Sequence, residues 1–261
     1  MIVRYIANTF KRTYDRRGML IYVFTLCLCV ISSTVYADMQ RITNSNYVLL
    51  ILCGGLTGKS DFAILFSFWI IPAMIVTFLS GTAASRECEG YKYISPRYGN
   101  RNTWLFCEIA NAIINSICYS LILIAIGVLA CLLNRKLTFF PLNPFILNRD
   151  TAAFQYWISD KFAIAELLVM SILRFMRIEL VLLFTRMLPK YHTQVGVIVV
   201  LVIEILSLIN TKDHIFLFTY FSASLTGVSL SFALITGVAG ILCIIGIGIS
   251  LFFFAAQSGQ A

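Results

Sequence analysis

Long apolar runs dominate this chain, and polar residues gather between them. Five runs are cleanly apolar, at about residues 19–37, 62–83, 109–133, 194–210 and 231–256. A sixth, at about residues 162–188, is interrupted by charged residues. One helical crossing of a bilayer core about 30 Å thick needs roughly 20 mostly apolar residues. Because the apolar residues are contiguous rather than alternating, the pattern predicts an all-α integral membrane protein with six transmembrane helices.

The composition agrees with a bilayer as the main solvent. Of the 261 residues, 59% are hydrophobic and 12% are charged, whereas soluble domains carry about 25% charged residues. We expect residues 1–261 to form a single transmembrane domain with the lipid bilayer as a partner. We expect no nucleic-acid partner.

Basic residues near the ends of the runs predict the orientation, because Lys and Arg are retained on the cytoplasmic side. Before the first run lie Arg4, Lys11, Arg12, Arg16 and Arg17, and between the second and third lie Arg86, Lys92, Arg97 and Arg101. Both termini and the segment from Arg86 to Trp104 are therefore predicted to face the cytoplasm. The segments around Asp38 and Phe145 are predicted to face outward.

Residues 1–17 have an apolar side and a basic side when they are projected on a helix. The apolar side holds Ile2, Val3, Ile6, Phe10 and Tyr14, and the other side holds Arg4, Lys11, Arg12, Asp15 and Arg16. This pattern predicts an amphipathic helix that lies in the inner membrane interface. An ordinary basic flank to the first span is the alternative.

No nucleotide, cofactor or metal site is predicted. The segment from Gly54 to Ser60 ends like a phosphate-binding loop, but Cys53 stands where that motif requires its first glycine. The eight cysteines show no CxxC pair and no Cys/His cluster with metal-ligand spacing. We therefore expect the cysteines to be packing residues and the chain not to be an enzyme.

The connection between the second and third runs, from Ser85 to Trp104, mixes acids, bases and aromatic residues. A short helix from about Ala84 to Ile94 would place Glu87 and Tyr91 on one face, because residues four apart are neighbours on a helix. Aromatic residues flanked by charges are typical of a protein contact. The segment therefore predicts a docking element at the cytoplasmic surface.

This stretch resembles the ABC-2 type permeases of bacterial exporters, and among them the small Gram-positive permeases of peptide, bacteriocin or lantibiotic systems. The resemblance is carried by Arg86-Glu87 and Glu89-Gly90, next to Tyr91, and by the pattern Arg97-Tyr98-Gly99-x-Arg101-x-x-Trp104. It implies that the segment is a coupling helix that docks into a separate ABC ATPase subunit, which binds the ATP. It also implies the bacterial cytoplasmic membrane and a second permease copy or paralogue as a partner.

The fourth run carries Glu166, Arg174, Arg177 and Glu179, and the fifth carries Glu204. Ionisable groups at membrane depth face protein or a water-filled cavity, so we expect Arg177 to pair with Glu166 or Glu204. These five residues form either a polar substrate path or hinge, or a set of ion pairs that holds two helices together. In the sixth run, Gly246 and Ser250 are four apart, a spacing that permits close helix packing.

Three functions remain open at this point. The first is a permease subunit that forms the pathway for a peptide or amphipathic substrate and is driven by a separate ATPase. The second is a stand-alone secondary transporter or membrane sensor that uses an intramembrane carboxylate such as Glu204. The third is an intramembrane enzyme that uses Glu166, Glu204 or His192.

Overall fold

The computed structural model describes residues 16–39, 49, 70–80, 101–134, 163–186, 193–209 and 230–257, and this part of the chain is helical without strands. Its elements are α2 (Arg16–Met39), α5 (Arg101–Leu133), α6 (Ala163–Arg186), α7 (Thr193–Ile209) and α8 (Leu230–Gln257). A further helical segment covers Ile70–Ser80. The predicted all-α fold class is confirmed for these residues.

Most of the described helices begin and end close to the ends of the predicted apolar runs, but the start of α5 differs. Helix α5 begins at Arg101, although the apolar run was expected to begin near residue 109. Glu108 interrupts the hydrophobicity without interrupting the helix, because a straight-chain Glu side chain loses little rotamer freedom in a helix, whereas Asn102 lies in the first turn, where Asn is tolerated. The described residues leave out most of residues 1–17 and the predicted coupling helix at 84–94. They also leave out most of the two segments predicted to lie outside, 38–61 and 134–160.

Two helical stretches, Arg17–Tyr36 and Asn102–Leu133, are long and apolar enough to cross a membrane. The apolar stretches Ile70–Ser80, Val195–Ile205 and Gly237–Phe253 are shorter. Helix α6 has the length, but it contains charged residues along its middle. By length and composition, the described residues therefore support two crossings rather than the six that the sequence pattern predicts.

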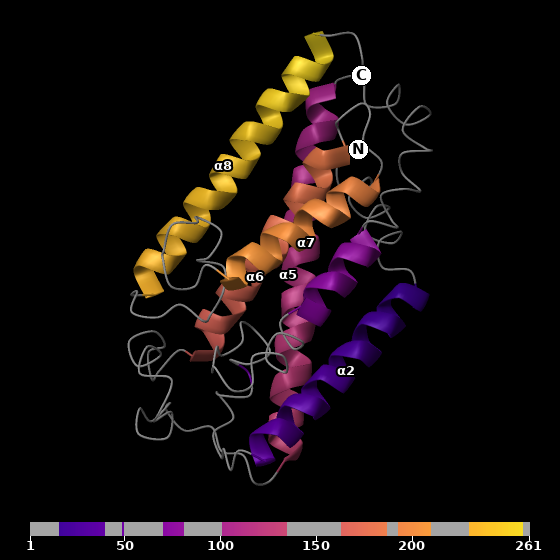
Figure 1. Ribbon diagram of the computed structural model, residues 1–261, viewed down its shortest axis with the longest axis vertical. Coiled ribbons are helices and arrows are strands. Elements are labelled where there is room, and N and C mark those ends of the chain that lie inside the picture. The colour runs from indigo at the N-terminus through magenta and orange to yellow at the C-terminus, as the bar shows by residue number, and fades with distance from the viewer. Residues whose placement is uncertain are drawn as a thin grey trace.

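Helix α6 lies at the centre of the described structure. It contacts α5, α7 and α8, whereas α2 contacts α5. Nearly every residue from Leu173 to Phe184 is buried, so α6 is enclosed over three turns. In Figure 1, α2 and α8 lie on opposite sides of the molecule, with α5, α6 and α7 between them.

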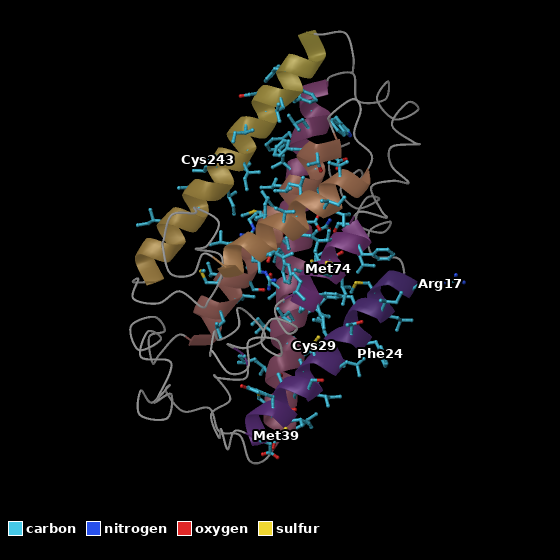
Figure 2. All side chains as sticks on the ribbon, in the orientation of Figure 1. Arg17, Phe24, Cys29, Met39, Met74 and Cys243 are labelled. Atoms are coloured by element: carbon cyan, nitrogen blue, oxygen red, sulfur yellow. The ribbon has the colours of Figure 1, made fainter. Side chains whose placement is uncertain are left out.

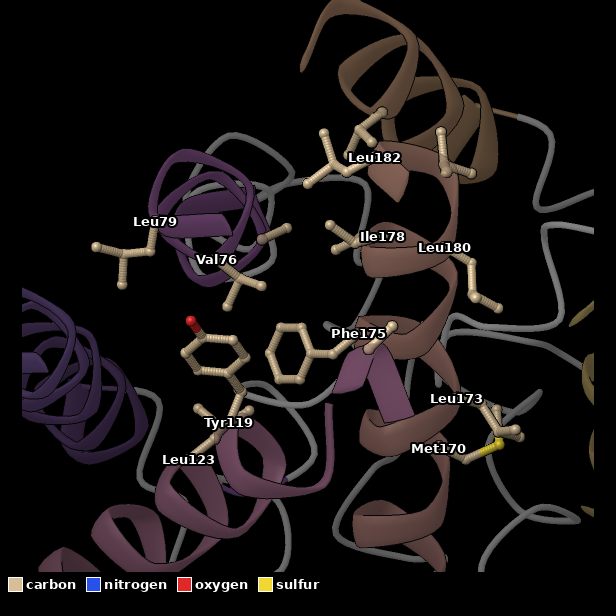
Figure 3. Packing of buried hydrophobic residues seen from close by; sticks show 14 of the residues in the cluster. Val76, Leu79, Tyr119, Leu123, Met170, Leu173, Phe175, Ile178, Leu180 and Leu182 are labelled. Atoms are coloured by element: carbon tan, nitrogen blue, oxygen red, sulfur yellow. The ribbon is translucent and has the colours of Figure 1, made fainter. Parts of the chain in front are cut away.

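Aromatic rings join α2, α5 and α6 in the interior. The Tyr22 and Tyr119 rings meet edge to face with centroids 5.0 Å apart, and Tyr119 and Phe175 do so at 6.3 Å. The Tyr22 hydroxyl also donates a hydrogen bond of 2.9 Å to the Tyr119 backbone carbonyl. Figure 3 shows Tyr119 facing Phe175, with Val76 of the Ile70–Ser80 segment beside both rings. Edge-to-face contacts of this kind add to the burial of apolar area.

The exterior of the described helices is apolar. Exposed large side chains include Phe24 on α2 at 65%, Ile198 on α7 at 58% and Leu242 on α8 at 62%. In Figure 2, Phe24 projects away from the bundle. Charged side chains in the middle of the helices are buried instead, among them Arg174, Arg177 and Glu204. This distribution reverses that of a water-soluble protein, in which charged residues are almost never fully buried unless they are paired.

Glycine residues allow α8 to pack closely on α6. A Cβ atom at Gly248 would lie 2.2 Å from Cδ1 of Phe184 on α6, whereas one at Gly246 would meet nothing within 4 Å. Gly246 and Ser250, the pair with the helix-packing spacing, lie on the exposed face of α8, where the Ser250 hydroxyl donates to the Gly246 carbonyl. Packing between α8 and α6 therefore depends on Gly248 and not on Gly246.

We expect Gly248→Ala to destabilise the protein, because the added methyl group collides with an aromatic ring that is itself buried. Overpacking of this kind costs about 1–3 kcal/mol. Gly246→Ala is the matched control, since it makes the same substitution two residues away on the open face. Thermal unfolding of the purified protein in detergent measures both. Equal midpoints for the two variants would contradict the packing described for Gly248.

Candidate functional site

The candidate site is a buried charge cluster between α6 and α7. Arg174 and Arg177 are three residues apart and therefore share a face of α6, and Glu204 lies on α7. Arg174 donates to Glu204 Oε2 from Nη2 at 3.1 Å and from Nε at 3.2 Å. Arg177 donates from Nη2 to the other oxygen, Oε1. Each of the three side chains is 1% exposed.

The cluster places two positive charges on one negative charge in a region without solvent. Transferring an ion out of water is costly, and mutual attraction compensates for this cost only when the geometry is good and the remaining groups are hydrogen-bonded. Both carboxylate oxygens of Glu204 accept hydrogen bonds from guanidinium groups. The Arg174 guanidinium carbon also lies 6.0 Å from the centroid of the Phe175 ring, a favourable position for a cation. Charge-assisted hydrogen bonds therefore join α6 to α7.

A second buried polar contact joins α6 to the segment Ile70–Ser80. The Ser80 hydroxyl donates a hydrogen bond to Oε1 of Glu179, and the two side chains are 2% and 4% exposed. Tyr119 of α5 lies close enough to both groups to interact with them electrostatically. Glu179 thus connects the end of this helical segment to the central helix.

Helix α5 contributes a polar face that the sequence analysis did not identify. The buried polar residues on this helix are Glu108, Asn111, Asn115, Ser116 and Ser120. The Ser171 hydroxyl of α6 donates to that of Ser120 at 3.2 Å. A signal was present in the sequence, because Glu108, Asn111 and Asn115 follow the three- and four-residue spacing of one helix face within an apolar run.

The predicted intramembrane residues fall into separate groups in the structure. Arg177 pairs with Glu204, one of its two expected partners, and Arg174 joins them. Glu179 contacts Ser80 instead. Glu166 belongs to α6, but its side chain lies outside the described residues. The sequence analysis therefore named all three residues of the charge cluster, but it did not predict that Arg174 also binds Glu204.

The predicted coupling residues are not tested by the structure. Arg86, Glu87, Glu89, Gly90, Tyr91, Arg97 and Tyr98 lie outside the described residues, and so does the side chain of Arg101. Trp104, at the end of the same pattern, lies in the first turns of α5 and stacks on Phe252 of α8 with centroids 6.4 Å apart. The end of the pattern is thus part of the contact between α5 and α8.

The described residues contain no group of three or more His, Cys, Asp or Glu side chains that could hold a metal ion. Cys27, Cys29, Cys107, Cys118 and Cys243 are free thiols. Comparison of the chain with protein-family models, with curated proteins and with solved structures finds no match. The functional argument therefore depends on the chain's own residues.

We expect Glu204→Gln to be strongly destabilising, because it leaves two buried arginines without their counter-ion. Breaking a buried pair by removing one partner costs about 3–5 kcal/mol. Val202→Ala, at an exposed position on α7, controls for the effect of a substitution in the same helix outside the cluster. Thermal unfolding in detergent provides the measurement.

The triple variant Arg174→Met/Arg177→Met/Glu204→Met tests whether the destabilisation comes from unpaired buried charge. It removes every charge of the cluster and keeps similar volumes, so we expect it to recover most of the stability that Glu204→Gln loses. A Glu204→Gln protein that unfolds at the same temperature as the parent would show that the cluster does not hold α6 and α7 together.

Proposed function

We propose that this chain is the membrane permease subunit of an ABC exporter. In this proposal the chain crosses the cytoplasmic membrane of a bacterium six times, with both termini inside. It forms the pathway for a peptide or amphipathic substrate with a second permease copy or a paralogue, and a separate ATPase subunit supplies the energy. The chain itself catalyses no reaction.

The observation that carries the membrane part of the proposal is the reversed polarity of the described helices. Large apolar side chains cover the outside of α2, α5, α7 and α8, while Arg174, Arg177, Glu179 and Glu204 are buried inside. Lipid tails favour such a surface, and intramembrane charges face the interior of a bundle. Helix α6 can therefore be a crossing in spite of its charges, because its neighbours separate those charges from lipid.

The directions of the outer helices support an even number of crossings. In Figure 2, α2 runs from Arg17 to Met39 down the view. In Figure 1, α8 ends at the top of the same view, and therefore runs in the opposite direction. A chain with six crossings and both ends on one side has antiparallel first and last spans, as these two helices are.

Length is the main objection to six crossings, and the structure offers a physical answer. Helix α7 has 17 residues and spans about 25 Å at roughly 1.5 Å per residue. A helix shorter than the hydrocarbon core is accommodated by local thinning of the bilayer or by snorkelling of flanking residues, at a modest energetic cost. The ion pairs with α6 hold α7 in the bundle in spite of this mismatch.

The transport part of the proposal comes from the resemblance of residues 86–104 to the coupling segment of ABC-2 type permeases. A carboxylate that carries protons in a stand-alone transporter needs an oxygen that is available to the proton. Both oxygens of Glu204 accept hydrogen bonds from arginine. This pairing favours a structural role for Glu204 and an external source of energy for transport.

The proposed orientation predicts the side from which single cysteines are labelled. In a cysteine-free background, Lys92→Cys should not react with an impermeant thiol reagent added to intact cells, because residue 92 faces the cytoplasm. Asp38→Cys, at the exposed end of α2, should react and serves as the positive control. Labelling at position 92 in intact cells would contradict the orientation.

The coupling segment predicts that Glu87→Arg/Tyr91→Ala loses its ATPase partner while the chain is still inserted in the membrane. Each position is a candidate interface hot spot, worth about 2 kcal/mol or more. The matched control is Tyr156→Ala/Asp160→Arg, which makes the same types of change at the same spacing in a segment predicted to lie outside. Co-purification of the ATPase and transport-coupled ATP hydrolysis are measured for both. Unchanged co-purification and hydrolysis in the first variant would overturn the coupling assignment.

A further inference from the structure

Glu108, Asn111 and Asn115 form a continuous polar face on the N-terminal half of α5, which the proposed orientation places toward the cytoplasm. Their exposed fractions are 6%, 5% and 3%, and their spacings of three and four residues place them on one side of the helix. Ile113 and Ile117 lie on the opposite side and are exposed. Helix α5 therefore separates an apolar face directed outward from a polar face directed into the bundle.

Asn111 is buried without a hydrogen-bond partner for its side-chain oxygen Oδ1. It lies ten residues beyond Arg101, about 15 Å along the helix at roughly 1.5 Å per residue. The Ser116 hydroxyl on the same helix differs, because it donates to the Ala112 carbonyl at 2.7 Å. A buried polar group without a partner is destabilising, so Asn111 weakens this fold rather than holding it together.

The chemistry of the face selects its ligand. The Asn111 carboxamide oxygen is a hydrogen-bond acceptor, and the Glu108 carboxylate one turn away accepts hydrogen bonds and carries negative charge. A cationic group that donates hydrogen bonds, such as an ammonium or a guanidinium, would satisfy the Asn111 oxygen and would be attracted by the negative charge of Glu108.

We propose that Glu108, Asn111 and Asn115 form a binding face for a cationic, hydrogen-bond-donating group of the transported substrate. This inference rests on the proposed transport function and adds to it the location and the charge preference of the pathway. The substrate enters from the cytoplasmic end of α5. The face is closed in the present structure and becomes accessible when the transporter is active.

The experiment measures the reactivity of Asn111→Cys toward two thiol reagents of similar size and opposite charge. The probes are the trimethylammonium-ethyl and sulfonato-ethyl methanethiosulfonates, added with ATP to inside-out vesicles that contain the cysteine-free full-length chain and its ATPase. The cationic reagent should react about tenfold faster or more, because a negatively lined cleft concentrates cations. Replacing Glu108 with Gln in the same background should remove most of this difference.

Ile113→Cys is the matched control, since it places the same thiol two residues away on the outward face of α5. Reaction of Asn111→Cys no faster than that of Ile113→Cys would overturn the binding face. Equal rates with both reagents would overturn the charge preference, and with it the proposed ligand. If either occurs while the ATPase still co-purifies with the chain, this inference fails and the proposed function stands. The rates are also measured without ATP, where reaction at position 111 should be slow because the face is closed. A charge-selective reaction that is equally fast without ATP supports the face but contradicts both its closure and the proposed source of energy.

A stability measurement tests the same inference without the partner. Asn111→Leu replaces a carboxamide whose oxygen has no hydrogen-bond partner with an apolar side chain of similar volume. The unfolding midpoint of this variant in detergent should therefore rise by about 2–4 °C. Ile113→Leu should leave the midpoint unchanged. A fall in the midpoint of Asn111→Leu would show that Asn111 makes stabilising contacts, and would overturn the assignment of this residue to a binding face.

Discussion

The attachment of Glu204 to both Arg174 and Arg177 is the interaction on which the rest of the structure depends. The three charged groups lie at the centre of the bundle, and each is stable there only because the others are present. The contact fixes how α7 is rotated against α6, since a helix that turned about its axis would carry Glu204 away from both guanidinium groups. The packing of α5 and α8 on the other faces of α6 is built around this arrangement.

The cluster also accounts for the division between an apolar exterior and a polar interior. In water, folding is driven by the burial of apolar surface, whereas lipid tails provide no such force between helices. In the proposed membrane location, the described helices would associate through other contacts, which include the charge cluster, the Ser80–Glu179 and Ser120–Ser171 hydrogen bonds, and the close approach of Gly248 to Phe184. A bundle of this kind can place polar groups where they act on a substrate.

The sequence predicted the helices well because apolar runs and helix length follow from the same physical requirement. It also indicated that Arg177 would find a carboxylate, since an unpaired charge at depth is costly. Helix geometry alone argues against Glu166, because eleven residues at roughly 1.5 Å each separate it from Arg177 by about 16 Å along α6. What the sequence could not give is that α7 packs beside α6 with Glu204 turned toward both arginines. Asn111 was overlooked for a different reason. A single amide does not interrupt a hydrophobic run, and its missing partner becomes visible only once the neighbouring helices are in place.

The spacing of small residues in α8 did not identify which of them packs against α6. Gly246 and Ser250 have the spacing that is typical of close helix contacts, yet they face outward, and Gly248 makes the close approach. The direction of a helix face is set by everything that packs against the helix. For α8 that direction is set by α6, whose own rotation is fixed by charges on α7.

The charges of α6 also bear on the order in which the chain can be assembled during synthesis. In the proposed membrane topology, α6 leaves the ribosome before α7, so Arg174 and Arg177 would reach the membrane before their counter-ion has been made. Each arginine at the centre of a helix opposes insertion by about 2.5–3.5 kcal/mol. A newly made α6 is therefore poorly suited to enter lipid by itself, and it has to stay beside the translocon or against α5 until Glu204 arrives. In the proposed topology the insertion of α6 and α7 becomes one event, and a chain that is truncated between them should fail to keep α6 in the membrane.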